Sequence, residues 1–274
     1  MIDTHLHLID RKALDYNWLS SAPDLDRDWS LHEYAAQARK IGITGALHME
    51  VDVADDRIED ETDWVEAQAK AGLFPILGII AACRPEADGF AAFLERNAQR
   101  VVGFRRVLHV VPHEVSQSTT FRTNVQSIGQ AGRVFDMCVL ARQLPLAIAL
   151  ADAAPNTPMV LDHCGGPDIE AGAWDDWAQS ITELAKRENV CAKLSGVVAY
   201  GGPNWSLDGL RPWVEHVAAQ FGPGRICWGG DWPVCTLGGG LPTWVAASRT
   251  ITESWSETER SKLYSENAQR IWRI

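Results

Sequence analysis

Short apolar runs alternate with longer amphipathic segments along almost the whole chain. The apolar runs are rich in Val, Ile and Leu and mostly lack polar alternation, which is typical of parallel strands buried on both faces. We predict eight strands, at Ile2–His5, Gly45–Val51, Phe74–Ala81, Val101–Leu108, Val134–Val139, Met159–Asp162, Val190–Leu194 and Ile226–Gly229. The segments between and after them predict helices over residues 30–42, 61–72, 89–100, 123–132, 144–154, 175–189, 210–222, 241–253 and 256–272.

Strands that alternate with helices in this way predict an α/β fold, a (β/α)8 TIM barrel. A doubly wound open sheet is the alternative. The strands recur about every 30 residues without a Gly-rich phosphate-binding fingerprint, which favours the closed barrel. The chain also has no Pro/Ser-rich linker and no low-complexity run. We therefore expect a single domain over residues 1–274.

The charge and the cysteines limit the partners and the compartment. A net charge of −11 argues against binding to nucleic acid or to an anionic membrane surface. No stretch is apolar for long enough to span a bilayer, and the first residues resemble a strand rather than a signal peptide. The six cysteines contain no Cys-x-x-Cys pair, as expected in a reducing cytoplasm. We expect a cytoplasmic protein, and its oligomeric state is open.

Polar residues collect where the predicted strands end, which is where barrels of this type form their active sites. His5 and His7 lie two residues apart and so project from the same face of the first strand, an arrangement that suits a metal ion or a polarised oxygen. Later strands add imidazoles, cations and a carboxylate at Arg105, His109, His163, Lys193 and Asp231. The whole set at one rim predicts an active site.

The same segments resemble a known family. "DTHLHL", "GFRRVLH", "VLDHCGGP", "CAKLSG", "GGDWPVC" and "ENAQRIW" are similar to motifs of the amidohydrolase superfamily, and more narrowly to its branch of sugar-lactone and related lactone hydrolases. The resemblance runs from the first strand to the last helix. It implies a distorted barrel and a hydrolase that opens the ring of a lactone, in the first place a sugar lactone such as L-fucono- or L-rhamnono-lactone.

The resemblance also implies roles for the residues at the rim. Asp231 would deprotonate the attacking water and later protonate the leaving alkoxide. His5, His7 and His163 would hold the carbonyl oxygen, directly or through one metal ion. We expect the substrate to be bound by Arg105, His109, Lys193, Glu50, Trp18 and Trp232.

A second metal ion is not expected. Members of the superfamily with two metals carry a bridging Lys or Glu on the fourth strand and a His on the fifth, whereas this chain offers Arg105, Arg106 and Asp136 there. Two divalent ions beside two guanidinium groups, with no bridging anion, would repel each other and the arginines. We predict either no required cofactor or one weakly bound Zn²⁺, with the ligands His5, His7, His163 and Asp231.

The sequence is compatible with more than one role for Glu50 and with more than one substrate. Glu50 either completes the metal site, pairs with a cation or binds a substrate hydroxyl. The alternatives to a sugar lactonase are a lactonase for a pyrone or muconolactone-type dicarboxylate, an isomerase or decarboxylase, a binuclear deacetylase and a non-catalytic sugar-binding barrel. Arg105 and Lys193 are compatible with an acidic substrate. Because Asp162 directly precedes His163 on a strand, we expect its side chain to face away from the site.

Overall fold

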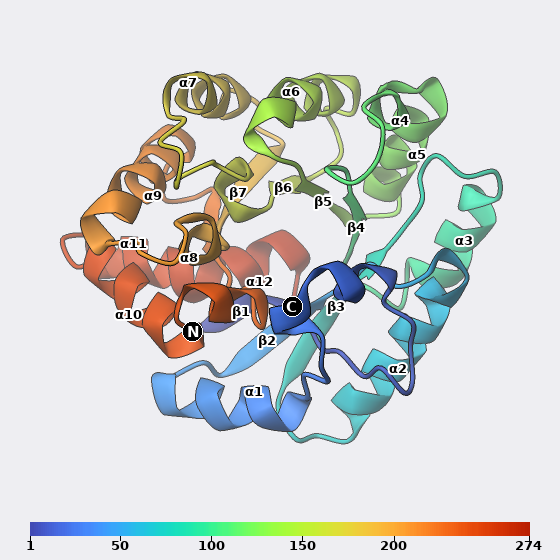
Figure 1. The fold of residues 1–274 in the computed structure, drawn as a ribbon. Coiled ribbons are helices and arrows are strands. Elements are labelled where there is room, and N and C mark those ends of the chain that lie inside the picture. The colour runs from blue at the N-terminus through green and yellow to red at the C-terminus, as the bar shows by residue number, and fades with distance from the viewer.

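The computed structural model describes residues 1–274 and confirms the barrel: eight parallel strands form one sheet, surrounded by helices (Figure 1). Each strand pairs with the next one along the chain. All eight predicted strands are present, although most are shorter than predicted. They are β1 Ile2–Leu6, β2 Gly45–Met49, β3 Ile76–Ala82, β4 Gly103–Val107, β5 Val134–Cys138, β6 Met159–Leu161, β7 Val190–Leu194 and β8 Ile226–Trp228.

Most of the helices follow one another around the barrel in chain order, as the colours of Figure 1 show. They are α1 Leu31–Ala38, α2 Ile58–Lys70, α3 Phe90–Asn97, α4 Glu114–Gln117, α5 Thr119–Gln130, α6 Leu144–Ala153, α7 Asp175–Leu184, α8 Val197–Tyr200, α9 Leu207–Phe221, α10 Leu241–Ile251, α11 Glu257–Ser261 and α12 Asn267–Trp272. The sequence did not predict α4 and α8, because a helix of one turn leaves no periodic pattern. The helix predicted over 256–272 is divided by a π-helical turn at Lys262–Glu266.

The barrel closes between β1 and β8 mainly through side chains and loop backbone, which agrees with the distorted barrel that was expected. Thr4 Oγ1 donates a hydrogen bond to the carbonyl of Trp228 at 2.8 Å. Asp3 accepts from the backbone N–H of Gly230 at 2.7 Å and from the hydroxyl of Tyr34 at 2.8 Å. These bonds tie the first strand to the loop that follows the last one.

The last helix closes the end of the barrel at which the strands begin. Ala268 and Trp272 of α12 are buried in an apolar cluster with Ile2 and Val134, which lie at the starts of β1 and β5. In Figure 1 the C-terminus accordingly projects onto the middle of the barrel. With this end filled by hydrocarbon, the interior is open only toward the carboxyl ends of the strands.

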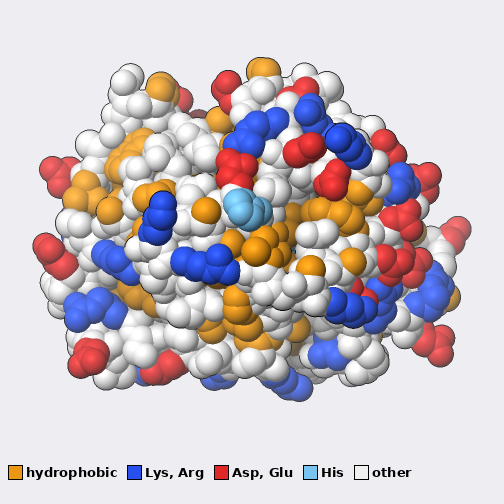
Figure 2. Space-filling model, turned by 90° about the horizontal axis from the view of Figure 1, so that it is seen from below, with side chains coloured by type: hydrophobic (Ala, Val, Ile, Leu, Met, Phe, Trp, Pro, Cys, Tyr) orange, Lys and Arg blue, Asp and Glu red, His pale blue; other side chains and the backbone are white.

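The outer surface of the helices carries interspersed charges. Figure 2 shows acidic and basic side chains next to each other on the side of the barrel where α1 lies. Many are paired: Arg96 of α3, for example, lies 2.9 Å from Glu59 of α2. None of the helices is both long enough and apolar enough to cross a bilayer.

Candidate active site

A cavity of about 380 Å³ lies at the carboxyl ends of the strands. Its volume is within the range of pockets that bind small molecules. Six of the predicted site residues line it: His7, Trp18, Arg105, His109, His163 and Asp231. The fold thus brings together side chains that follow β1, β4, β6 and β8, as the strand-end argument expected.

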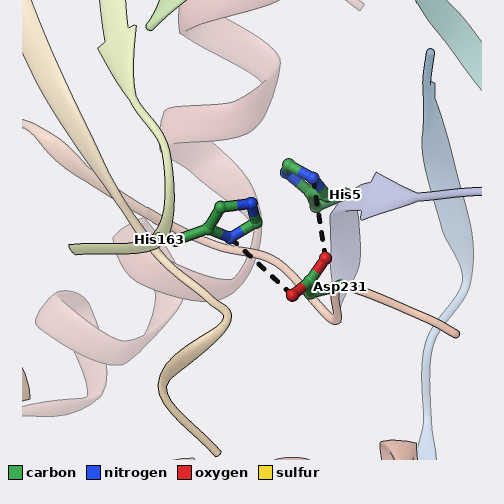
Figure 3. A group of neighbouring side chains, drawn as sticks. All are labelled: His5, His163 and Asp231. Carbon is green, nitrogen blue, oxygen red and sulfur yellow. Dashed lines mark ion pairs between the residues drawn. The ribbon is translucent and has the colours of Figure 1, made fainter. Parts of the chain in front are cut away.

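The carboxylate of Asp231 lies between imidazoles (Figure 3). Its Oδ1 is 3.7 Å from Nε2 of His5 and 3.6 Å from Nε2 of His7, and its Oδ2 is 3.8 Å from Nδ1 of His163. These separations are longer than direct hydrogen bonds. The four side chains therefore surround a point that a water molecule, a substrate oxygen or a metal ion can occupy.

The backbone is strained at residues of the cavity wall. Asp231, His163 and Asp52 have φ angles of 55°, 52° and 47°, in the left-handed region that residues other than Gly seldom adopt. Such conformations cost about 1–3 kcal/mol each and cluster at functional sites. Their presence at the carboxylate and at one of the imidazoles supports a functional role for this part of the wall.

The orientation of His7 is set by the backbone. Its Nδ1 lies 3.0 Å from the carbonyl oxygen of Met49. Because a carbonyl only accepts, Nδ1 carries a proton, and in the neutral ring Nε2 presents its lone pair to the carboxylate of Asp231. Two acceptors that face each other require a proton donor or a cation between them.

Burial keeps the other imidazoles of the site neutral. The pKa of His5 is well below its usual range because the ring is fully buried and also lies near the Lys193 ammonium. Burial likewise lowers the pKa of His163, and burial together with Arg105 lowers the pKa of His109 to about 4. Neutral imidazoles can coordinate a metal or accept a proton.

The site fits one divalent ion. Ligand atoms of His5, His163 and Asp231 all lie within 4.8 Å of one another, and the lone pair of His7 points to the same carboxylate. Nitrogen and carboxylate ligands of Zn²⁺ stand about 2.0–2.2 Å from the metal, which places neighbouring ligand atoms about 3.4 Å apart. The N–O separations of 3.6–3.8 Å around Asp231 are compatible with this spacing.

A group of charged residues, which we call the buried charge layer, lies beneath the cavity. It consists of Glu50, Arg105, Asp136, Asp162 and Lys193, none of which is more than 5% exposed. Lys193 Nζ lies 2.8 Å from both Asp136 Oδ1 and Asp162 Oδ1. Arg105 Nε donates to Glu50 Oε1 at 2.6 Å. Each charge in this layer therefore has an opposite partner, and three carboxylates against two cations leave the layer formally negative.

The expectation that Asp162 faces away from the site was wrong. Its carboxylate lies 3.5 Å from Arg105 and 3.6 Å from Nδ1 of His5, besides its contact with Lys193. The reason is that β6 ends at Leu161, and His163 and Cys164 have positive φ, so the alternation of a strand no longer applies. Although burial opposes it, the Lys193 ammonium and His5 hold the pKa of Asp162 well below its usual range.

Three predicted substrate-binding residues lie outside the lining of the cavity. Lys193 and Glu50 belong to the buried charge layer, where Glu50 pairs with Arg105 rather than standing free as a metal ligand. Trp232 is fully buried, and its ring packs against Trp29 and Tyr34 with centroid distances of 5.3 and 5.5 Å.

Sequence reasoning also missed residues that the structure places at the site. Asp52 and Tyr200 line the cavity, and Ser195 Oγ lies 2.9 Å from Nδ1 of His163. Ser195 directly follows β7 and was detectable by the strand-end rule. Tyr200 was not, because it ends the short helix α8.

Comparisons with known proteins agree with this picture. The model of a family described as "Amidohydrolase" matches residues 2–274. An L-fucono-1,5-lactonase of Burkholderia multivorans is 27% identical over 100% of this chain and 96% of its own length. A 4-sulfomuconolactone hydrolase of Rhizobium radiobacter is 25% identical over 84% of this chain and 75% of its own. A crystal structure of an amidohydrolase from Burkholderia multivorans with bound zinc superposes with a TM-score of 0.89 at 25% identity, covering 100% of this chain and 99% of that one.

Proposed function

Because this chain belongs to the amidohydrolase family, as its motifs predicted, we infer that it is a lactone hydrolase in which Asp231 activates the water. The relatives named above act on lactones. The observation that carries the proposal is the strained, buried carboxylate of Asp231 on the cavity wall, with His5, His7 and His163 around it.

The reaction needs a base, a polarised carbonyl and a proton for the leaving oxygen. Asp231 takes a proton from water as the water oxygen bonds to the carbonyl carbon. The ring C–O bond then breaks, and Asp231 returns the proton to the alkoxide, which leaves a hydroxy acid. The position of the carbonyl oxygen lies among His5, His7 and His163. The Arg105 guanidinium beside His5 stabilises the negative charge that develops on this oxygen, and the lone pair on Nε2 of His7 would hold a metal ion that does the same.

We propose that at most one divalent ion such as Zn²⁺ binds here, held by His5, His163 and Asp231 with His7 beside them. When bound, it would polarise the carbonyl of the substrate. The guanidinium of Arg105, with NH1 3.3 Å from Nε2 of His5, already places positive charge at this point. Glu50 pairs with this charge and moderates it, and the remaining positive charge opposes a second ion.

The charges of the cavity wall favour a neutral lactone. Lys193 is buried in the charge layer, and Arg105 already binds Glu50. A pyrone or muconolactone dicarboxylate would therefore meet no free cation among the lining residues, whereas Asp52 and Asp231 would repel it. The sugar lactones, such as L-fucono- and L-rhamnono-lactone, satisfy this charge condition.

The proposal is tested by measuring acid release from a panel of neutral and dicarboxylate lactones with a pH indicator. Each lactone is assayed with and without a chelator. We expect ring opening of neutral lactones, at most one metal equivalent by elemental analysis, and a rate that chelation lowers without abolishing. Absence of acid release from every lactone would refute lactone hydrolysis. Two tightly bound equivalents whose removal abolishes activity would refute the single-ion site.

A further inference from the structure

We propose that the substrate carries a hydrocarbon group outside its lactone ring, so that this protein prefers alkyl-substituted lactones to polyhydroxylated ones. The inference rests on the proposed lactone hydrolysis and names the substrate class of the same cavity. It departs from the sugar lactone that the sequence predicted, and the walls of the cavity are the reason.

The loops above the strand ends line the cavity with aliphatic side chains. Ile9 and Leu25 follow β1, Val51 follows β2, Val110 follows β4 and Val234 follows β8. The polar catalytic side chains come from the strand ends below these loops. A substituent that extends from the reacting ring toward solvent therefore passes along hydrocarbon, where burial of apolar surface is favourable.

Polar side chains of the upper wall are already engaged within the protein. The indole N–H of Trp18 donates to the carbonyl of Val51 at 2.8 Å, and Ser21 Oγ donates to the carbonyl of Trp18 at 2.7 Å. Asp52 accepts from Arg84 at 3.3 Å. Trp18 and Ser21 therefore have no free donor to offer a bound substrate, and Asp52 keeps one carboxylate oxygen that can accept from a single hydroxyl.

Few partners remain for a polyhydroxylated substrate. Arg105 uses Nε and NH2 on Glu50, at 2.6 and 2.9 Å. Outside the catalytic group, the unpartnered polar atoms of the lining are those of His109 and Tyr200, the thiol of Cys138 and one carboxylate oxygen of Asp52. A sugar lactone carries a hydroxyl on most ring carbons, and each hydroxyl that loses water without gaining a partner weakens binding.

The mouth of the cavity is apolar as well. Val110 is 58% exposed there and is the most accessible of the four large hydrophobic side chains that the chain exposes. An alkyl substituent that extends outward from the lactone ring can cover Val110. The cavity and its mouth thus form one continuous apolar path.

The test compares lactones with the same ring size and different substituents: δ-valerolactone, δ-nonalactone with its butyl chain, and the hydroxylated D-glucono-1,5-lactone. We expect kcat/KM for δ-nonalactone to exceed that for δ-valerolactone by at least about 10-fold and that for the glucono-lactone by about 100-fold. Hydrolysis of the glucono-lactone or of L-fucono-1,5-lactone with equal or higher kcat/KM would overturn this inference and leave lactone hydrolysis standing. Failure to hydrolyse any lactone would overturn both.

Variants locate the preference on the wall. Val110→Asn should lower the ratio of kcat/KM for δ-nonalactone to that for δ-valerolactone by about 10-fold, because it replaces an apolar contact with an amide. Leu73→Asn is the matched control, since Leu73 is 38% exposed and lies outside the cavity, and this variant should keep the ratio. An unchanged ratio in Val110→Asn would contradict the proposed path of the alkyl chain.

Discussion

The cavity and the buried charge layer beneath it are built from similar residues, yet their charges are arranged differently. In the layer each charge has an opposite charge within hydrogen-bond distance, such as Lys193 with Asp136 at 2.8 Å. In the cavity Asp231 stays 3.6–3.8 Å from the imidazoles around it. Satisfied charges hold a structure together, whereas a carboxylate without a close partner is available to a substrate. The difference predicts which substitutions change activity and which change stability.

The largest effect is expected from Asp231→Asn. Loss of the general base should lower kcat by about 10²–10⁴-fold or more, while the free energy of unfolding stays the same or rises, because Asn tolerates the left-handed backbone well. Steady-state kinetics and urea unfolding measure the two quantities. The control is Asp56→Asn, at an exposed position outside the cavity. A folded Asp231→Asn protein with near-normal kcat would remove Asp231 from the mechanism.

Lys193→Met should act mainly on stability. It leaves Asp136 buried without a cation and Asp162 with Arg105 alone at 3.5 Å, which should lower the free energy of unfolding by about 3–5 kcal/mol. Lys186→Met is the control, because this exposed lysine pairs only with Glu183 on the surface, and its loss should cost less than about 1 kcal/mol. Wild-type stability of Lys193→Met in urea unfolding would show that the layer is not what stabilises this end of the barrel.

Arg105 belongs to both regions, so Arg105→Lys should have a smaller effect on each. Lys cannot reproduce the fork that binds Glu50, and we expect kcat/KM to fall by about 10-fold and the free energy of unfolding by about 1–3 kcal/mol. The neighbouring Arg106 is a close control, because it also binds one carboxylate through two nitrogens, that of Glu86 at 2.9 and 2.6 Å, outside the cavity lining. Arg106→Lys should retain kcat/KM. Equal losses in both variants would assign Arg105 a structural role alone.

The fold and the rim residues were accessible to sequence reasoning for a physical reason. Parallel strands leave an apolar signature, and barrel topology brings their carboxyl ends to one rim. His7, His163 and Asp231 were found by this rule and line the cavity. The rule gives the end of the barrel at which a residue lies, but not the depth or the direction of its side chain.

Direction and depth depend on contacts that the sequence does not display. Lys193 lies within β7 rather than after it, so its side chain stays in the barrel interior. Trp232 follows a residue with positive φ, where the alternation of a strand fails, and it turns into the apolar core. The sequence left three alternatives for the role of Glu50. Its pairing with Arg105 depends on the distance between β2 and β4, which are not neighbours in the sheet.

The closure of the barrel between β1 and β8 affects how the protein matures during synthesis. The two histidines of the first strand leave the ribosome early, but the carboxylate that they face is translated near the end of the chain. Contacts between such distant segments form slowly in folding, since the intervening loop must first be ordered. Asp3 can bind the N–H of Gly230 only when both ends of the chain have been made. Catalytic competence should therefore appear in the last step of folding, and a nascent chain that stops before β8 should be inactive even where its earlier strands have paired.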